Sequence, residues 1–223
     1  MPVAAVVFDL FGTLLDIASL RTAAAFVCAT PDAFVATWRE KQLAYAFASA
    51  IMDRYEDFDA LTGHAARFAA AKHRLSLDEA QIDALVRAWE YVAPYPDAAA
   101  TLAALTAAGV RCAVLTNGTP ATSRAAMQHA GIESSIDVAL YVDDAGVYKP
   151  DKRVYDLVTR HYGVEPAELV FVTSNGWDAT GATVYGMRVA WCNRAGNPAE
   201  TYGPPPAWTV PTLDALPALL TAG

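Results

Sequence analysis

The chain has 223 residues, of which 54% are hydrophobic and 18% charged, and its formal net charge is −8. This length and composition are typical of an ordered globular protein with a substantial core, which excludes a disordered chain and a small disulfide-stapled scaffold. The excess of acidic residues repels polyanions, so neither nucleic acid nor an anionic membrane is expected as a partner.

The first element is a short apolar run over residues 3–8, which predicts a buried parallel strand and ends at Asp9. A carboxylate in this position stands at the rim of the sheet, where open α/β folds bind ligands. Asp9 is therefore a candidate nucleophile, although an isolated Asp after a strand more often caps the next turn or helix. No basic leader precedes the run, which is too short for a membrane span, so a cytoplasmic protein is expected.

A long helical stretch follows, because residues 18–92 are rich in Ala, Leu, Arg and Glu and place apolar residues at helical spacing. This pattern predicts a helical insertion over residues 16–95, with residues 1–15 and 96–223 forming an α/β core. Within the insertion, Arg39, Leu43 and Phe47 are four residues apart and share one helix face. A helix arginine is usually a solvent-exposed cation, so Arg39 alone indicates little.

The rest of the chain alternates strand and helix, which predicts an α/β fold with a central parallel sheet. Asp97 is expected to cap a helix that runs to Ala108 and ends at Gly109. Further strands are predicted over residues 110–116, 169–173 and 188–192. A proline-rich connection near residues 203–206 then leads to a short C-terminal helix that is rich in leucine.

Polar groups follow these strands and form the remaining candidates for a site. Asn117 comes directly after one strand, and its side-chain amide can donate to an anion. Pro150 is expected to open a helix, which would place Lys149 at the N-terminal edge of that helix. Residues 174–178 add a hydroxyl, an amide and a carboxylate after another strand. Each cluster alone has an ordinary explanation, but polar clusters at four strand ends indicate a common site.

Several other chemistries are not indicated. Cys28, Cys112 and Cys192 lie far apart without a CxxC pair, so neither a disulfide framework nor a zinc cluster is expected. The four histidines, which lack metal-ligand spacing, are expected on surface helices. Dinucleotide-binding, P-loop and GxSxG motifs are missing from the sequence as well. We therefore expect no metal and no cofactor.

Taken together, these segments resemble the haloacid dehalogenase superfamily over nearly the whole chain. The resemblance rests on the following four segments: Asp9-Leu-Phe-Gly-Thr13, Leu115-Thr-Asn-Gly118, Lys149-Pro150 and Ser174-Asn-Gly-Trp-Asp178. Within the superfamily, Trp38-Arg-Glu-Lys-Gln-Leu43 and residues 174–182 are similar to the L-2-haloacid dehalogenases. This likeness implies a Rossmann-like core with a central parallel sheet, an inserted helical-bundle cap and a homodimer.

The resemblance also implies a reaction, the hydrolysis of a small 2-haloalkanoic acid through an ester on Asp9, which releases halide and inverts C2. The catalytic side chains it implies are Asp9, Thr13, Arg39, Asn117, Lys149, Ser174, Asn175 and Asp178. The substrate-binding residues it implies are Leu10, Phe11, Leu43, Phe47, Thr116, Tyr155 and Trp177. Arg39 and Asn117 would receive the halide, and Asp178 would orient or activate the water.

Two alternatives stay open at this point. A phosphatase of the same fold carries a second Asp two positions after the nucleophile and binds magnesium through paired carboxylates, whereas this chain has Phe11 and Asn175 there. A departing halide needs no proton, so the missing acid does not hinder a dehalogenase. The dehalogenase is favoured, a magnesium-dependent phosphatase is the alternative, and a non-enzymatic binding role comes third.

Some positions depart from the usual dehalogenase pattern. Glu40 stands where a glutamine is frequent, Phe47 where a tryptophan is frequent, and Thr116 where a serine is frequent. Gly176 similarly takes the place of a common alanine. These departures leave the chemistry intact, but they leave substrate size and halogen preference open.

Overall fold

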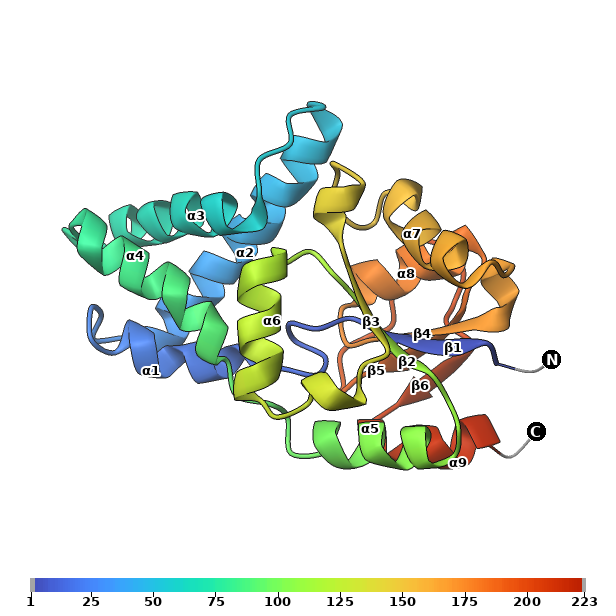
Figure 1. Ribbon diagram of the computed structural model, residues 1–223. Coiled ribbons are helices and arrows are strands. Elements are labelled where there is room, and N and C mark those ends of the chain that lie inside the picture. The colour runs from blue at the N-terminus through green and yellow to red at the C-terminus, as the bar shows by residue number, and fades with distance from the viewer. Residues whose placement is uncertain (1–2, 222–223) are drawn as a thin grey trace.

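A single parallel sheet organises the molecule. The computed structural model describes residues 3–221 and shows six strands in the order β3-β2-β1-β4-β5-β6, all paired in parallel. The strands are β1 (Ala5–Phe8), β2 (Cys112–Thr116), β3 (Val138–Tyr141), β4 (Leu169–Thr173), β5 (Arg188–Cys192) and β6 (Trp208–Val210). The predicted α/β fold with a central parallel sheet is thereby confirmed (Figure 1).

Helices cover both faces of this sheet, which explains why β1, β2 and β4 are buried at every position. Alternate residues of each strand point to opposite faces. One face packs against α5 (Ala98–Ala107), α6 (Pro120–His129) and α9 (Leu216–Thr221). The other face packs against α7 (Lys152–Tyr162) and α8 (Gly176–Tyr185). Figure 1 shows α5 and α9 below the sheet and α7 and α8 above it.

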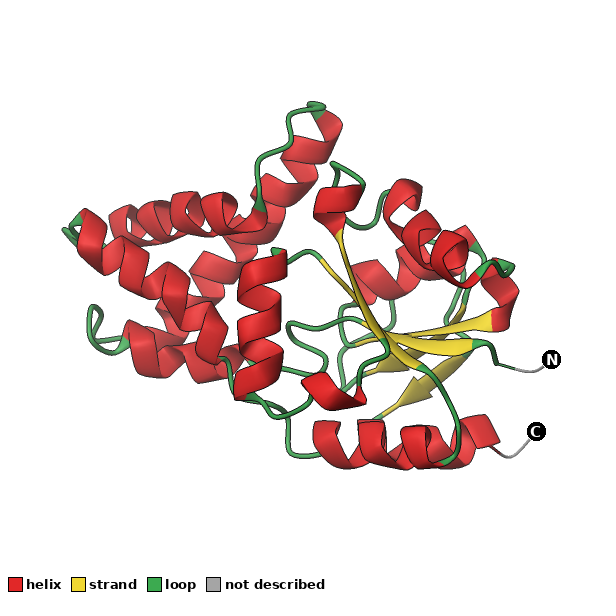
Figure 2. Cartoon of the chain, viewed as in Figure 1, coloured by secondary structure: helices red, strands yellow, loops and turns green. Residues whose placement is uncertain are grey.

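The segment between β1 and α5 is helical. It contains α1 (Arg21–Ala24), α2 (Pro31–Ile51), α3 (Phe58–Lys72) and α4 (Glu79–Arg87), with short 3-10 helices at its two ends. Figure 2 shows these helices as a body beside the strands, and we call this body the cap. Trp38 is fully buried between α2 and α3 and donates from Nε1 to the carbonyl of Thr62 at 2.9 Å. This contact fixes how the two longest cap helices pack.

The chain enters and leaves the cap through two segments that run side by side. The N–H of Asp16 donates to the carbonyl of Ala93 at 2.7 Å, and the N–H of Tyr95 donates to the carbonyl of Leu14 at 2.9 Å. Leu15 and Pro94 also form an antiparallel bridge. The cap is therefore joined to the core by a paired connection next to the loop that carries Asp9.

The structure corrects several local predictions. The strands β3 and β6 were not predicted; β3 is a half-buried edge strand of four residues, and β6 has only three residues. Pro150 does not open a helix, since α7 begins at Lys152 with Asp151 as its N-cap. Asp97 precedes α5 without a side-chain capping bond. Its carboxylate instead binds Arg194 at 2.7 and 2.8 Å and the N–H of Leu213 at 2.8 Å, which ties down the C-terminal segment.

Two smaller corrections concern a helix end and a histidine. The helix α5 ends at Ala107, one residue before the predicted Ala108, and Gly109 follows with a φ of +77°. His73 was expected on the surface, but it is half-buried, because its ring packs against Phe34 and its Nε2 lies 3.1 Å from the hydroxyl of Thr37.

Candidate active site

A buried lysine joins two buried carboxylates at the carboxyl ends of the strands. The Nζ of Lys149 donates to Asp9 Oδ1 at 2.7 Å, to Asp178 Oδ2 at 2.8 Å and to the carbonyl of Leu115 at 3.0 Å. The side chains of Lys149 and Asp178 are fully buried, and that of Asp9 is 8% exposed. The ammonium uses all three hydrogens, so its orientation is fixed, and the carboxylate with residual exposure is Asp9.

The charges of this cluster stabilise one another. Burial alone would lower the pKa of Lys149, but the carboxylates of Asp178 and Asp9 outweigh burial and raise this pKa, so the ammonium stays charged. Burial raises the pKa of Asp178, and the charge of Lys149 acts against that rise. A carboxylate with a raised pKa accepts a proton more readily than an exposed one, which suits Asp178 to the work of a base.

The second oxygen of Asp9 is held by two donors. Thr13 Oγ1 donates to Asp9 Oδ2 at 3.0 Å, and Asn175 Nδ2 donates to the same atom at 2.9 Å. Thr13 Oγ1 also accepts from the N–H of Ser174 at 2.9 Å, so Ser174 contributes here through its backbone. Gly12, with a φ of +95°, makes the sharp turn that lets Thr13 reach back to Asp9.

Tyr155 lies behind Asp178. Its hydroxyl donates to Asp178 Oδ1 at 2.7 Å, while Asp178 Oδ2 accepts from Lys149. Burial raises the pKa of Tyr155 well above its ordinary value, and the charge of Asp178 adds to this effect, so the phenol keeps its proton. The structure thus places Tyr155 as a partner of Asp178 in the core, where it has no exposed surface.

The loop after β2 lies beside Lys149. Asn117 Oδ1 accepts from the N–H of Lys149 at 3.1 Å, and Thr116 Oγ1 accepts from the N–H of Gly118 at 3.1 Å. A Cβ on Gly118 would lie 2.6 Å from Ser123 Oγ and 2.7 Å from an edge carbon of Phe11. Only glycine fits between these two side chains, which explains the Thr-Asn-Gly order after this strand.

The cap contributes Arg39. This side chain is half-buried, its Nη1 donates to Gln42 Oε1 at 2.7 Å, and its guanidinium lies 5.7 Å from the centre of the Trp89 ring. Burial lowers the pKa of Arg39 to about 10, and the charges of Asp9 and Asp178 oppose that change. Arg39 therefore stays charged at neutral pH and interacts electrostatically with the carboxylates of Asp9 and Asp178.

Apolar side chains meet where the cap faces the core. Leu43 and Phe47 are half-buried on α2, and the Phe47 ring packs edge-to-face against Trp177 with centroids 5.2 Å apart. Leu10 and Phe11 are buried in the loop after Asp9, and Phe11 packs against Trp89 at 5.3 Å. Among the predicted apolar residues, Phe47 and Trp177 are thus in contact at the cap–core junction, and Leu10 and Phe11 are buried next to Asp9 in the sequence.

A cavity of about 470 Å³ opens at this junction. It lies between the C-terminal half of α2 and the segment that precedes α7, and its walls are mostly apolar. Its lining consists of Phe47, Ala50, Ile51, Tyr148, Lys149, Pro150, Asp151 and Trp177. Lys149 is among these residues, but its side chain is fully buried, so the cavity borders the charged cluster without exposing its side chains.

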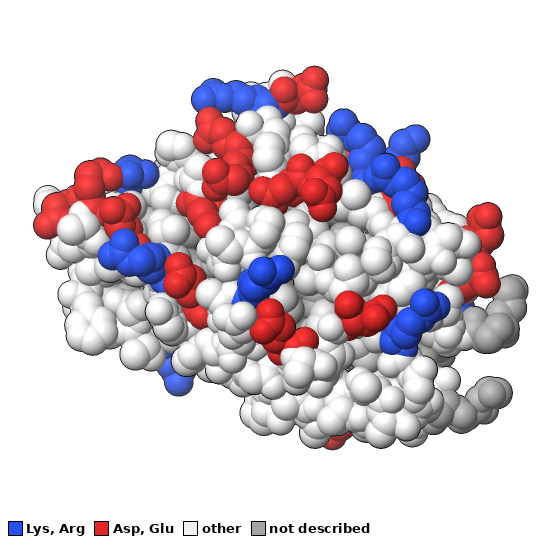
Figure 3. Space-filling view, in the orientation of Figure 1, with Lys and Arg blue, Asp and Glu red and all other residues white. Residues whose placement is uncertain are grey.

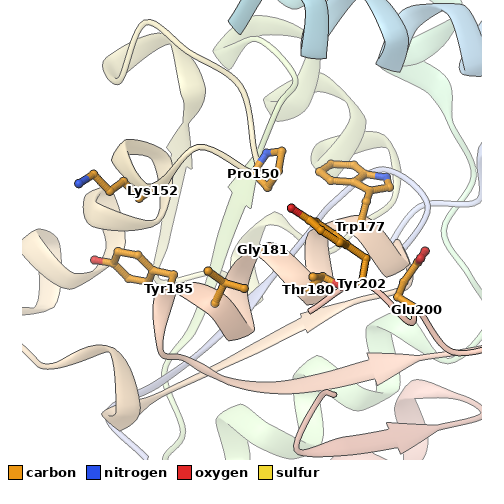
Figure 4. Close-up of a pocket in the computed structure, with 9 residues that line it drawn as sticks. Pro150, Lys152, Trp177, Thr180, Gly181, Tyr185, Glu200 and Tyr202 are labelled. Carbon is orange, nitrogen blue, oxygen red and sulfur yellow. The ribbon is translucent and has the colours of Figure 1, made fainter. Parts of the chain in front are cut away.

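A second cavity, of about 560 Å³, lies over the outer face of α8 (Figure 4). Figure 4 shows Lys152 and Tyr185 on one side of it, Trp177 and Glu200 on the other, and Pro150 and Tyr202 between them. Pro150 and Trp177 line both cavities, but Asp9, Lys149 and Asp178 do not line this one. This second cavity therefore lies outside the charged centre.

The residues that connect the cap to the core were not predicted from the sequence. The hydroxyls of Thr119, the N-cap of α6, and of Thr122 on α6 both donate to Asp59 Oδ2 of the cap, each at 2.8 Å. The hydroxyl of Tyr148 donates to the carbonyl of Glu56 at 2.5 Å. These partners are about 60 to 90 positions apart in the sequence, so no local spacing marks them.

The side chains of the charged cluster determine whether it can coordinate a divalent cation. Such a cation would occupy the space between the carboxylates of Asp9 and Asp178, but the Lys149 ammonium bridges these carboxylates, and Asn175 adds a neutral amide. Across residues 3–221, no three His, Cys, Asp or Glu side chains gather as metal ligands. The donor set does not fit a magnesium site.

Two further observations concern the charge on the surface and the apolar character of the helices. Figure 3 shows acidic and basic side chains interspersed over one face of the molecule, without a continuous basic patch on that face. Among the described residues, no helix combines the length and the apolar character that a membrane crossing requires.

Known proteins match the chain over almost its full length. The sequence model of the haloacid dehalogenase-like hydrolases matches residues 3–186. An (S)-2-haloacid dehalogenase of Pseudomonas sp. (strain YL) is 38% identical over 213 residues, which cover 95% of this chain and 91% of that protein. The structure of L-2-haloacid dehalogenase from Xanthobacter autotrophicus with chloropropionic acid covalently bound has a TM-score of 0.93 at 34% identity and covers 98% of both chains.

The same fold also occurs in a phosphatase. The structure of a HAD phosphatase from Thermococcus onnurineus has a TM-score of 0.67 at 25% identity and covers 99% of this chain and 98% of that chain. The chain is thus closer in structure and sequence to the dehalogenase of Xanthobacter autotrophicus than to this phosphatase.

Proposed function

The chain belongs to the haloacid dehalogenase-like hydrolases, and from this premise we propose that it is an (S)-2-haloacid dehalogenase. It hydrolyses L-2-haloalkanoates to D-2-hydroxy acids and halide, the substrate class that the names of its relatives carry. The observation that carries the proposal is the lysine bridge, in which Lys149 holds the Asp9 and Asp178 carboxylates at 2.7 and 2.8 Å. This bridge fixes the Asp9 carboxylate in place for nucleophilic attack.

In the first step, Asp9 attacks C2 of the substrate from the side opposite the halogen. Oδ1, which accepts one hydrogen bond, forms the new C–O bond, while Oδ2 keeps its bonds from Thr13 and Asn175. The C–halogen bond breaks as the C–O bond forms, and halide leaves with the bonding electron pair. The configuration at C2 inverts, and no proton is required by the leaving group.

In the second step, water attacks the Asp9 carbonyl carbon of the ester. Negative charge then develops on Oδ2, where Thr13 and Asn175 already donate, so the existing hydrogen bonds stabilise the tetrahedral intermediate. Asp178 takes the proton of the attacking water, and the bond between the carbonyl carbon and Oδ1 breaks. Oδ1 leaves with the product as its hydroxyl group and receives that proton from Asp178. The oxygen of water stays in Asp9, and its second proton is released to solvent, which restores the Asp9 carboxylate.

The cap and the loop after β2 complete the site in this proposal. Arg39 stays charged and meets the departing halide, with Asn117 beside it. Leu43, Phe47 and Trp177 form the apolar wall for the alkyl chain. The substrate carboxylate binds to Thr116 and to the backbone near Leu10 and Phe11. The other predicted site residues act through the contacts described for them above.

The alternative, a magnesium-dependent phosphatase, has less support. Phe11, where a phosphatase carries its acid, is buried against Trp89 at 5.3 Å, and the space between Asp9 and Asp178 is bridged by Lys149. A leaving alcohol therefore finds no proton donor at this position, and a divalent cation finds no opening between the carboxylates.

One experiment separates the two functions. Halide release is measured from L- and D-2-chloropropionate in the presence of EDTA, beside phosphate release from a generic phosphate ester with magnesium. The proposal predicts halide from the L enantiomer alone, unaffected by EDTA and abolished in Asp9→Asn. Magnesium-dependent phosphate release without halide would establish the alternative.

The proposal extends to assembly and location. We propose a homodimer in which the cap surfaces meet, because Ile51, Met52 and Phe68 are exposed there beside a groove of about 550 Å³. Light scattering of the purified protein tests this, since a monomer at micromolar concentration would contradict it. A cytoplasmic location and the lack of nucleic-acid and membrane partners stay predictions that rest on the cysteine pattern and the net charge of −8.

A further inference from the structure

A chain of hydrogen bonds inside the cap ends at the guanidinium of Arg39. Thr62 Oγ1 donates to the carbonyl of Phe58 at 2.6 Å, and Gln42 Nε2 donates to Thr62 Oγ1 at 2.5 Å. Gln42 Oε1 in turn accepts from Arg39 Nη1 at 2.7 Å. Gln42 has no exposed surface and Thr62 is 2% exposed, so water does not substitute for these partners.

The direction of this chain follows from its first member. A backbone carbonyl only accepts, so Phe58 takes the single hydroxyl hydrogen of Thr62. The oxygen of Thr62 is then left to accept, which turns the NH₂ group of Gln42 toward Thr62 and its carbonyl oxygen toward Arg39. The helix backbone of α3 thereby determines which atom of Gln42 the arginine meets.

We infer that Gln42 and Thr62 are positioning residues that hold the Arg39 guanidinium where it receives the departing halide. This inference rests on the proposed function, because it assigns no separate reaction. An arginine side chain has many rotamers, and holding it in one of them before the reaction removes that ordering from the barrier. The face of Trp89, 5.7 Å from the guanidinium carbon, covers Arg39 from another direction.

The inference predicts a change in leaving-group preference, which a merely structural role would not cause. Chloride is the poorer leaving group and the smaller anion, so its departure depends more on a well-placed cation than the departure of bromide does. Loss of the Thr62 hydroxyl should therefore slow chloride release more than bromide release. The ratio of the two single-turnover rates, bromopropionate over chloropropionate, measures this effect without depending on how much enzyme is folded.

The test uses Thr62→Val, which keeps the shape of the side chain and removes its hydroxyl. We expect the bromo-to-chloro ratio to rise about fivefold, the fold-change that corresponds to one lost neutral hydrogen bond, here that between Gln42 and Thr62. Thr62→Ser restores the hydroxyl and should return the ratio toward that of the wild type. Thr106→Val removes the same kind of bond, from a threonine hydroxyl to the carbonyl four residues earlier, on α5, and should leave the ratio unchanged.

A double variant decides whether the effect passes through the arginine. Arg39→Lys alone should raise the ratio at least as much as Thr62→Val, and adding Thr62→Val to Arg39→Lys should change it no further. If Thr62→Val does not fold, Gln42→Met supplies the same measurement. An unchanged ratio in an active Thr62→Val protein overturns the inference and leaves the proposed function intact, whereas a wild type that releases no halide from either substrate overturns the proposed function itself.

Discussion

The two halves of the site are built differently. In the core half, Asp9 and Asp178 each use both carboxylate oxygens in hydrogen bonds, and Lys149 uses all three hydrogens. In the cap half, Arg39 is half-buried and depends on one hydrogen bond and one ring face. In the proposed reaction, the core half carries the covalent steps that every substrate shares, whereas the cap half meets the parts that vary, the halogen and the alkyl chain.

This difference between the two halves predicts where substitutions are tolerated. A group that is buried and fully bonded cannot be altered without leaving a partner unpaired, and that loss is costly in the interior. The side chains of the cap meet the core at a few contacts, such as Phe47 with Trp177 and Asp59 with Thr119 and Thr122. We therefore expect variants in the core to stop the reaction and variants in the cap to alter its selectivity.

The largest expected effect is on the bridge itself. Lys149→Met leaves two buried carboxylates without a counter-charge, which should cost about 3–5 kcal/mol of unfolding free energy. Halide release should fall by about 1,000-fold, because Asp9 loses the ammonium that holds it in place. Thermal unfolding and a halide burst assay measure the two effects. Lys152→Met is the matched control, since this lysine is exposed at the start of α7, and equal losses in both variants would contradict the account.

The second prediction concerns Asp9 Oδ2. Asn175→Ala removes one of its two donors and should slow ester hydrolysis about 100-fold, because the tetrahedral intermediate loses a preformed hydrogen bond. Ester formation should be affected less, so the covalent intermediate should accumulate and be visible by mass spectrometry of quenched protein. Asn193→Ala, in a surface turn, should behave as the wild type. Faster loss of the ester in Asn175→Ala would refute this role of the amide.

The third prediction concerns pH. Asp178 must be charged to take a proton from water, so ester hydrolysis falls as the pH drops through the pKa of Asp178. Burial raises this pKa, and the hydrogen bond from Tyr155 acts against that rise. Tyr155→Phe removes the opposing bond, so the acid limb should move to higher pH, with a plateau rate reduced by less than about tenfold.

The measurement is a pH profile of ester decay in single turnovers. Tyr185→Phe is the control, because its hydroxyl donates to Asp156 on α7, away from Asp178. An acid limb that stays in place in Tyr155→Phe, or moves to lower pH, would show that Asp178 is not the base.

The smallest expected effect lies in the cap. Phe47→Trp adds volume where α2 faces Trp177 and should lower the rate on a four-carbon haloacid about fivefold relative to a three-carbon one. Steady-state rates across two-, three- and four-carbon haloacids measure this profile. Phe26→Trp, at an exposed position of the cap after α1, should leave the profile as it is. A profile that Phe47→Trp does not change would remove Phe47 from the substrate pocket.

The contrast between the core half and the cap half also explains which parts of the site could be predicted from the sequence. The charged cluster was predictable because the carboxyl ends of parallel strands meet at one edge, so polar residues after successive strands gather there. Asp9, Lys149 and Asp178 carry this signal, and the resemblance to the haloacid dehalogenases gave them roles. The family and the α/β fold are confirmed by the comparisons and the sheet topology.

The supporting contacts were not predictable for a physical reason. Gln42 meets Thr62 only because α2 and α3 pack together around Trp38, and helix packing is not written in local spacing. Asp59 meets Thr119 and Thr122 across the junction between cap and core. The strand β3, in contrast, carries an apolar run at Val138–Tyr141 like that of β1, so here the sequence did hold a signal that the prediction missed.

The proposed reaction requires a covalent intermediate on Asp9. Rapid quenching with L-2-chloropropionate, followed by peptide mass spectrometry, detects such an intermediate directly. We predict a propionate ester on the peptide that contains Asp9, formed as fast as chloride is released, insensitive to EDTA and missing in Asp9→Asn. Chloride release without any adduct, or an adduct on another residue, would contradict the account.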